Sequence, residues 1–190
     1  WHGITCTNGN VTVLDLSNNN LTGNIPAEIG NLSTLQTLAL NVNNLSGTIP
    51  AELDDLTALE YLYLSVNQLS GPIPAELGNL SNLQALWLGY NNLSGEIPAS
   101  LGNLPNLFQL FLSDNQLSGS VPDSFGTLSG LYELDVSQNG LSGSLPLSLT
   151  NLQNLVTLRY VNTQLCPPAD EAFQTWLANV ADVIGNENCG

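Results

Sequence analysis

Few side chains in this sequence have the chemistry of a catalytic or metal-binding group. Its 190 residues hold one histidine (His2), no lysine, and no serine within a G-x-S-x-G nucleophile motif. The three cysteines lie too far apart in the sequence for a C-x-x-C metal site. Glu133 and Asp135 could imitate the carboxylate pair of a glycosidase, although two charged surface residues are the more ordinary interpretation. We therefore expect no catalytic residue, no metal site and no cofactor, and a protein that is not an enzyme.

The charge balance excludes two further classes of function. The chain carries 16 Asp and Glu against the single Arg159, a formal net charge of -15. Binding to nucleic acids requires clustered Lys and Arg, and docking to anionic membranes requires a basic patch. The chain is 43% hydrophobic and only 9% charged, so it can bury a core, but its apolar runs are too short to span a bilayer. It opens with Trp1 and shows no signal peptide, so we expect a mature or trimmed fragment.

The elements that must position any site repeat along the chain. A pattern of 24 residues, L-x-x-L-x-L-x-x-N-x-L-S/T-G-x-I-P-x-x-L-G-x-L-x-x, recurs without a gap. Its seven blocks begin at Val11, Leu35, Leu59, Leu83, Leu107, Leu131 and Leu155. Such a period is typical of a solenoid, in which each repeat buries its apolar face against its neighbours.

Each column of the repeat has a physical role. In the fourth block, Leu86 and Leu88 lie two apart on a short predicted strand and face inward. Asn91 also occupies an inward position, and because a buried amide must be hydrogen-bonded, the stacked asparagines are predicted to form a ladder. Gly95 permits a positive φ or a close approach of two backbones. Pro98 ends strand pairing and begins an extended return path.

This pattern resembles the plant-specific class of leucine-rich repeats, marked by L-S/T-G-x-I-P, as in plant receptor kinase ectodomains and polygalacturonase-inhibiting proteins. The resemblance covers residues 11–165 as seven repeats. It implies an α/β fold: a right-handed curved solenoid with a parallel β-sheet on the concave face and short extra strands or tight turns on the flank. It also implies a binding role. Trp1 to Cys6 is similar to the end of the family's N-terminal cap, so residues 1–10 are expected to be a partial cap of one domain, 1–190.

Residues 166–190 are predicted to close the C-terminal end of the solenoid with a helix. Asp170 and Glu171 suit its first turn through the helix dipole, and Gly185 is expected to end it. One apolar stripe at helical spacing indicates the face that covers the core: Phe173, Trp176, Leu177, Val180 and Ile184. This helical cap departs from the plant receptors, so a bacterial secreted or surface protein with plant-type repeats is an equal alternative.

Two cysteines flank the predicted cap. Cys166 and Cys189 either form a disulfide that staples the cap or remain two reduced thiols. A disulfide would imply an oxidising compartment, so we expect a secreted or cell-surface protein.

The positions that the repeat leaves free point outward on the concave side. Seven of the twelve aromatic residues occupy them in blocks three to six: Tyr61, Tyr63, Trp87, Tyr90, Phe108, Phe111 and Tyr132. Because leucines already fill the core, we interpret them as an exposed patch that binds a partner; the alternative is that strands simply favour aromatics. Four acidic residues border the patch: Glu60, Asp114, Glu133 and Asp135. Asp135 is expected to form an exposed ion pair with Arg159 on the next repeat.

Three non-catalytic functions fit these features. The first is a binding module that recognises a protein, a peptide or a glycan through the concave face, with an acidic rim that favours basic partners. The second is a passive spacer or adhesin segment on a surface. The third is ice binding through a regular row of hydroxyls: Thr22, Ser46, Ser70, Ser94, Ser118 and Ser142.

Overall fold

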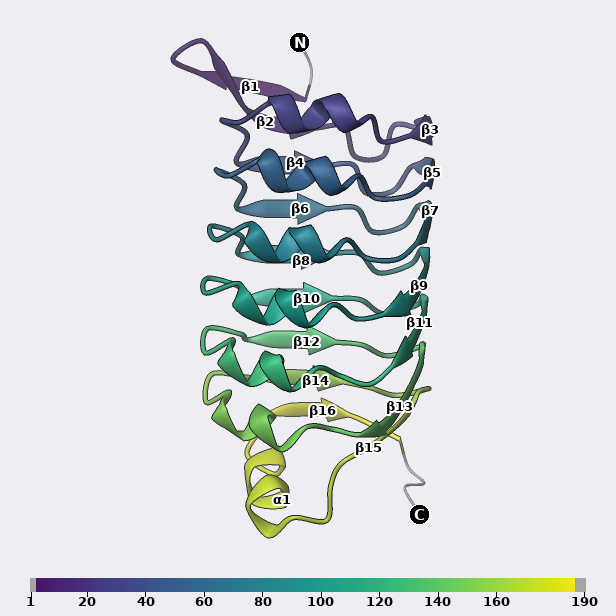
Figure 1. Cartoon of the computed structure of the whole chain (residues 1–190), viewed down its shortest axis with the longest axis vertical. Helices are drawn as coiled ribbons and strands as arrows, with labels where there is room; N and C mark the ends of the chain where they lie inside the picture. The colour runs from purple at the N-terminus through teal and green to yellow at the C-terminus, as the bar shows by residue number, and fades with distance from the viewer. Residues whose placement is uncertain (1–2, 187–190) are drawn as a thin grey trace.

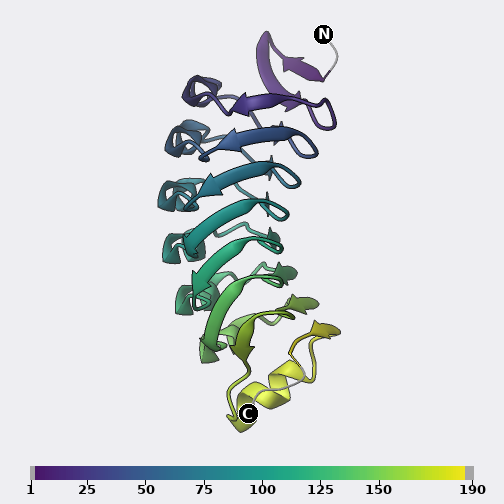
Figure 2. The same cartoon turned by 90° about the vertical axis from the view of Figure 1, so that its right-hand side faces the viewer.

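The chain winds into a right-handed coil with one sheet along its inner face and another along its flank. The computed structural model describes residues 3–186. Its longer sheet has the strand order β1-β2-β4-β6-β8-β10-β12-β14-β16 within these residues. The strands are β1 (Ile4–Thr7), β2 (Asn10–Asp15), β4 (Thr37–Ala39), β6 (Tyr61–Tyr63), β8 (Ala85–Trp87), β10 (Gln109–Phe111), β12 (Glu133–Asp135), β14 (Thr157–Arg159) and β16 (Asp182–Ile184). Figure 2 shows the coil curving so that this sheet lies on the concave side.

The register of the concave sheet follows the sequence repeat. Leu62 pairs with Leu38 on one side and with Leu86 on the other, so partners lie 24 residues apart. Among residues 3–186, the pairs from β2 to β16 are parallel, and only the β1–β2 hairpin is antiparallel. Equivalent positions of successive repeats therefore form straight columns across the sheet.

The expected extra strands of the flank form a second, parallel sheet. Its order is β15-β13-β11-β9-β7-β5-β3. These strands are β3 (Thr22–Asn24), β5 (Asn44–Gly47), β7 (Gln68–Gly71), β9 (Asn92–Glu96), β11 (Gln116–Gly119), β13 (Gly140–Ser144) and β15 (Gln164–Cys166). The glycine in these segments adopts a positive φ, as expected; it is +83° at Gly95.

Short 3-10 helices line the convex side, which the repeat pattern did not predict. They are η1 (Ala27–Asn31), η2 (Ala51–Asp55), η3 (Ala75–Asn79), η4 (Ala99–Asn103), η5 (Asp123–Thr127) and η6 (Leu147–Asn151). Each follows a proline in extended conformation, such as Pro98 with φ -63°. They stack closely: a Cβ on Gly102 would lie 2.5 Å from the Ser124 carbonyl oxygen of the next repeat, so only glycine fits there.

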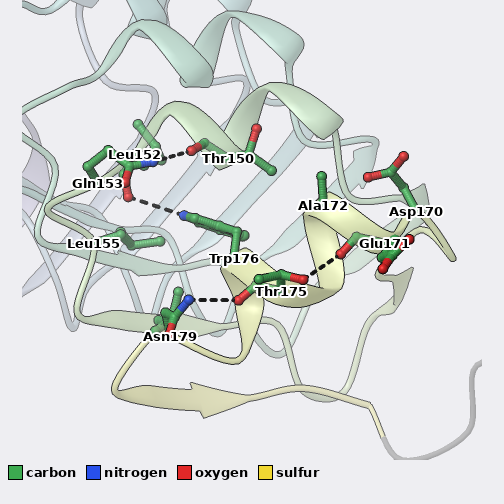
Figure 3. A pocket seen from close by; sticks show the side chains of 11 residues that line it. Thr150, Leu152, Gln153, Leu155, Asp170, Glu171, Ala172, Thr175, Trp176 and Asn179 are labelled. Atoms are coloured by element: carbon green, nitrogen blue, oxygen red, sulfur yellow. Dashed lines mark hydrogen bonds between the residues drawn. The ribbon is translucent and has the colours of Figure 1, made fainter.

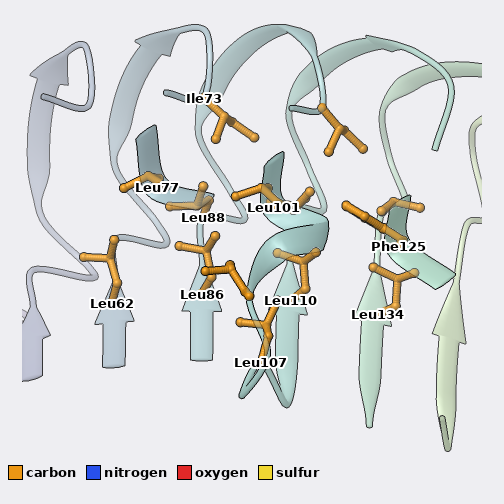
Figure 4. Packing of buried hydrophobic residues seen from close by; sticks show 14 of the residues in the cluster. Leu62, Ile73, Leu77, Leu86, Leu88, Leu101, Leu107, Leu110, Phe125 and Leu134 are labelled. Atoms are coloured by element: carbon orange, nitrogen blue, oxygen red, sulfur yellow. The ribbon is translucent and has the colours of Figure 1, made fainter. Parts of the chain in front are cut away.

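Leucines from the strands and the 3-10 helices fill the space between the two sides of the coil. Leu86, Leu88 and Leu101 are fully buried, as are Leu110 and Leu134 in the neighbouring repeats (Figure 4). Burial of each such side chain contributes about 1.5–3 kcal/mol before conformational entropy is counted. The core is thus shared between repeats, which explains why no repeat is stable alone.

The predicted asparagine ladder is present. The Asn91 Oδ1 atom accepts from the Leu69 N–H at 3.0 Å, and its Nδ2 atom donates to the carbonyls of Leu64 (3.1 Å) and Leu88 (3.0 Å). Asn91 therefore joins its own repeat to the preceding one. Asn19 has no preceding repeat to bridge, and its exposed side chain donates to the Ser17 carbonyl.

The C-terminal cap differs from the sequence prediction. Helix α1 (Glu171–Leu177) begins where expected, with the Asp170 carboxylate accepting from the Phe173 N–H at 2.9 Å, but it ends well before Gly185. The chain then forms β16, which pairs with β14. The physical reason is the open edge of β14: the N–H of Tyr160, directly after β14, donates to the Ile184 carbonyl at 2.9 Å. Helical periodicity cannot reveal such a sheet edge, because it arises only in the folded coil.

Parts of two sequence predictions lie outside the described residues. Trp1 and His2 of the expected N-terminal cap are among them, while Cys6 is exposed with a free thiol. Cys189 is also outside, so the expected Cys166–Cys189 disulfide stays a prediction.

Candidate functional site

The three-residue strands of the concave sheet present their first and third residues outward. In β8, Leu86 points into the core and is fully buried, whereas Trp87 is half-buried on the opposite face. The parallel register then places Tyr63 and Phe111 on either side of Trp87 in the same column. The residues that the sequence singled out are thus brought together by strand pairing and not by proximity in the chain.

Four of these residues form a continuous aromatic ladder, which we define as Tyr61, Tyr63, Trp87 and Phe111. The ring centroids of Tyr63 and Trp87 are 4.5 Å apart, those of Trp87 and Phe111 5.4 Å, and those of Tyr61 and Tyr63 6.1 Å. The rings are tilted against one another and none is fully buried. A ladder of this kind is a rigid apolar surface across three strands.

The other three aromatic residues do not join this ladder, so the expected single patch is divided. Phe108 and Tyr132 stack on each other at 4.9 Å, at the start of their strands. Tyr90 follows β8 in a left-handed turn, with φ 57°, and is 59% exposed. Of the seven aromatic residues, only Tyr90 and Phe108 are exposed; the four ladder residues and Tyr132 are half-buried.

Polar groups around the ladder differ in how well they are satisfied. The Tyr61 hydroxyl donates to Gln84 Oε1 at 3.1 Å, and Gln84 Nε2 donates to Glu60 Oε2 at 3.1 Å. Gln84 was not among the predicted site residues, because a polar residue at a free position gives no sequence signal. Trp87 Nε1 is itself buried and has no hydrogen-bond partner among the described residues. A buried indole N–H without an acceptor costs free energy, and a hydrogen bond to an acceptor would remove this cost.

Three of the four acidic residues, Asp114, Glu133 and Asp135, lie toward one end of the ladder, whereas Glu60 lies near Tyr61 at the other. Asp135 is the register partner of Phe111, and Glu133 lies on the same face of β12. Asp135 Oδ1 accepts from the backbone N–H of Ser137 at 3.0 Å and from its hydroxyl at 2.5 Å. Asp114 is half-buried beyond the end of β10. The concave face therefore changes from aromatic to acidic between β10 and β12.

The predicted ion pair between Asp135 and Arg159 is wrong. Arg159 Nη2 contacts Asp182 Oδ2 at 2.9 Å, and both side chains are 44% exposed. Asp182 raises the pKa of Arg159 through this hydrogen bond. The sequence could not indicate the pair, because Asp182 was assigned to the capping helix and instead lies on β16.

Burial affects one hydroxyl of the ladder. The pKa of Tyr63 is raised above its ordinary value. The main cause is burial, which disfavours the charged form, and the second is the charge interaction with the hydroxyl group of Tyr61. Tyr63 therefore stays neutral at physiological pH and acts as an apolar surface with a polar tip.

The hollows among the described residues lie away from the ladder, and two of them adjoin the concave strands or the cap. One, of about 560 Å³, is lined by Phe108, Tyr132 and Asn179 among others, at the start of the concave strands. The larger, about 780 Å³, lies between η6 and α1, where Trp176 Nε1 donates to the Leu152 carbonyl at 3.4 Å (Figure 3). Its lining residues close the end of the core, so we assign this second hollow to the cap.

The repeat pattern and the fold are matched by known family models. A model described as "Leucine-rich repeat region" matches residues 12–116. A second, "Leucine Rich Repeat", matches residues 106–128 and 130–152. The chain belongs to the leucine-rich repeat family.

Solved structures similar to this leucine-rich repeat chain include plant receptors. The chain "PEPR1-AtPEP1" is 42% identical with a TM-score of 0.82, over 87% of this chain and 27% of that one. The ectodomain of the Arabidopsis receptor kinase HAESA, in complex with an extended IDA peptide hormone, is 38% identical with a TM-score of 0.81, over 93% of this chain and 29% of that one. A plant ice-binding protein is 32% identical with a TM-score of 0.79, over 87% of this chain and 62% of that one. The chain thus spans less than a third of those two receptor chains.

Other observations bear on the class of this leucine-rich repeat protein. No curated protein matches the chain. Within residues 3–186, no group of His, Cys, Asp and Glu side chains is arranged to hold a metal ion. No helix in that part is long and apolar enough to cross a membrane.

Proposed function

We propose that this protein is a non-catalytic binding module that recognises a protein, peptide or glycan through the aromatic ladder on its concave face. The observation that carries this proposal is the contact of Tyr63, Trp87 and Phe111 in one column outside the leucine core. The fold does not need these rings, because the inward leucines are already fully buried. Trp and Tyr at such positions are typical anchors of interfaces.

Two features of the ladder in the protein without a ligand favour binding of a partner. Its rings are half-exposed, and Trp87 Nε1 has no acceptor among the described residues. This donor is buried, so a ligand oxygen would reach it only after the indole rotates, and the rings would lose contact with water in the same step. The ladder therefore offers apolar area and one directional hydrogen bond.

The comparisons support a protein or peptide partner over a glycan. Similar chains have been solved as a peptide hormone receptor in complex with RGF2 and as HAESA with a peptide hormone. By analogy with these receptors, we place this protein on the cell surface or outside the cell. The acidic residues of the concave face are compatible with a protein, a peptide or a glycan, but they favour a partner with basic groups.

A combined peptide and glycan array tests the proposal. We expect a specific probe to bind the wild-type protein, and Trp87→Ala to weaken that binding by about 30-fold, which corresponds to the roughly 2 kcal/mol of an anchoring residue. Leu147→Ala is the matched control, because Leu147 is an apolar residue that is 52% exposed on the convex η6.

Two results would contradict the proposal. One is an array on which the wild-type protein retains no probe. The other is a set of probes that bind wild type and Trp87→Ala equally well.

A second candidate function, ice binding, is favoured by one observation. The protein is similar to a plant ice-binding protein, and its flank sheet carries a hydroxyl in each repeat. Two of these hydroxyls are already turned to the protein: Ser46 and Ser70 donate to the carbonyls of Gly23 (3.4 Å) and Gly47 (3.5 Å). Absence of ice recrystallisation inhibition at micromolar protein would exclude this function, and inhibition unchanged in Trp87→Ala would place it on the flank.

A further inference from the structure

The geometry points to a defined ligand for the concave face: a peptide in polyproline II conformation that places an apolar residue on Trp87 and a Lys or Arg three residues away at Asp135 and Glu133. This inference rests on the proposed function and specifies the chemistry of the partner. It commits to one occupant of the concave face, on grounds of charge and spacing.

Charge complementarity requires a cation in the ligand. Arg159 is the only Arg or Lys in the sequence, and Asp182 holds it at 2.9 Å. Asp135 and Glu133 lie beside this pair, so three carboxylates surround one guanidinium and the cluster keeps a net negative charge. A ligand without a cation would leave these two carboxylates desolvated and unpaired.

The carboxylates of Asp135 and Glu133 can also accept hydrogen bonds from a ligand. Asp135 uses Oδ1 for Ser137, and no hydrogen bond joins its Oδ2 to another residue in the described part of the chain. No hydrogen bond of the Glu133 side chain is found there either. Ligand ammonium or guanidinium N–H groups can therefore bind Asp135 Oδ2 without breaking the existing contact, and Phe111 on the preceding strand offers its ring to the same cation.

The spacing of the columns selects the conformation of the ligand. Trp87 and Asp135 occupy the same column two strands apart, with Phe111 between them. Neighbouring strands lie about 4.8 Å apart, so this separation along the sheet is about 9.6 Å. Polyproline II rises about 3.1 Å per residue with three residues per turn, so residues i and i+3 lie on one side about 9.3 Å apart. A fully extended strand fails this test, because its residues i and i+3 point to opposite sides.

The ladder suits such a ligand in two further ways. Polyproline II helices dock on surfaces lined by aromatic rings, and the ladder is such a surface. The backbone of that helix makes no internal hydrogen bonds, so one of its carbonyls can accept from Trp87 Nε1, which is buried without a partner among the described residues, once the indole rotates.

Selection from a phage library of random twelve-residue peptides tests the inference. We expect the peptides retained by wild type to carry Lys or Arg three residues from a proline, aromatic or aliphatic residue. Insertion of one residue between the two should weaken binding at least 10-fold in fluorescence anisotropy. Charge reversal with Asp135→Lys and Glu133→Lys should weaken it at least 10-fold and, on reselection, replace the basic residue by Asp or Glu at the same offset.

Controls separate folding from recognition. Glu76→Lys is the matched charge reversal, because Glu76 is exposed on the convex η3. Asp135→Lys removes the acceptor of Ser137 and can disturb the fold, so Glu133→Lys alone serves as the second variant. Circular dichroism establishes that each variant is folded.

The possible outcomes distinguish the two proposals. Peptides whose binding depends on Trp87 but tolerates insertion, or needs no basic residue, overturn this inference and leave the proposed function intact. If no retained peptide depends on Trp87, peptide recognition by the ladder fails, and the inference fails with it.

Discussion

The two faces of a single strand show how this solenoid divides its tasks. In β8, Leu86 is fully buried against leucines of both neighbouring repeats, and the position is leucine in β4, β6, β10, β12 and β14 as well. On the opposite face the column of Trp87 changes from Ala39 to Tyr63, then to Phe111 and Asp135. The inward face repeats because every repeat meets the same neighbours, whereas the outward face meets only solvent or a ligand.

The faces also differ in how completely their polar groups are satisfied. The buried amide of Asn91 bonds to three backbone groups within 3.1 Å, in two repeats. On the concave side, Trp87 Nε1 has no partner among the described residues. The inward face thus holds the coil together, and the unsatisfied group on the concave face agrees with the binding role that we propose for it.

The largest expected effect separates two adjacent residues. Leu86→Ala leaves a cavity in the core, and we expect it to lower the free energy of unfolding by about 4 kcal/mol. Trp87→Ala removes only contacts among half-buried rings, so we expect a loss of about 1 kcal/mol. Urea denaturation followed by circular dichroism measures both. Equal losses would mean that Trp87 belongs to the core and that the division of the faces is wrong.

The asparagine ladder gives the next largest effect. Asn91→Ala leaves the Leu69 N–H and the Leu64 and Leu88 carbonyls without their partner, so we expect a loss of about 3 kcal/mol in the same denaturation experiment. Asn19→Ala is the control: the same repeat position at the exposed end should lose less than about 1 kcal/mol. A small effect at Asn91 would show that the interrepeat bonds do not limit stability.

The ion pair on the concave face is expected to matter little. Arg159 and Asp182 are both 44% exposed, so Asp182→Asn should cost about 0.5 kcal/mol at low salt, and this loss should vanish at high salt. Asp135→Asn, which keeps an oxygen to accept from Ser137, should cost less. Thermal unfolding at two salt concentrations measures both losses of stability. A larger salt-dependent loss of stability in Asp135→Asn than in Asp182→Asn would support the Asp135–Arg159 pair that was predicted from the sequence.

The smallest effect concerns alkaline pH. The pKa of Tyr63 is raised by burial, so above about pH 10 the folded protein retains a proton that the unfolded chain releases. Tyr63 therefore favours folding below that pH, and this contribution is lost as the pH rises through the raised pKa. Tyr63→Phe should lessen the alkaline loss of stability, but part should remain, because burial also raises the pKa of Tyr160. A melting temperature with the same alkaline dependence in both proteins would contradict this assignment.

The repeated features could be read from the sequence because each depends only on position within the repeat. The inward leucines, the asparagine ladder, the positive φ of Gly95 and the column of Tyr63, Trp87 and Phe111 were all predicted correctly. A fixed period converts residue spacing into spatial neighbourhood, so the sequence by itself determined the coil, its concave sheet and the residues that face outward on it.

Only the tertiary structure decided how the chain folds after the last repeat and which neighbours the outward side chains contact. The open edge of β14 drew residues 182–184 into the sheet, which shortened α1 and gave Arg159 the partner Asp182. Ring packing likewise divided the aromatic group, because Phe108 meets Tyr132 at one end of the strands while Tyr90 turns away at the other. Such choices depend on the competition of groups in three dimensions, which neither composition nor periodicity records.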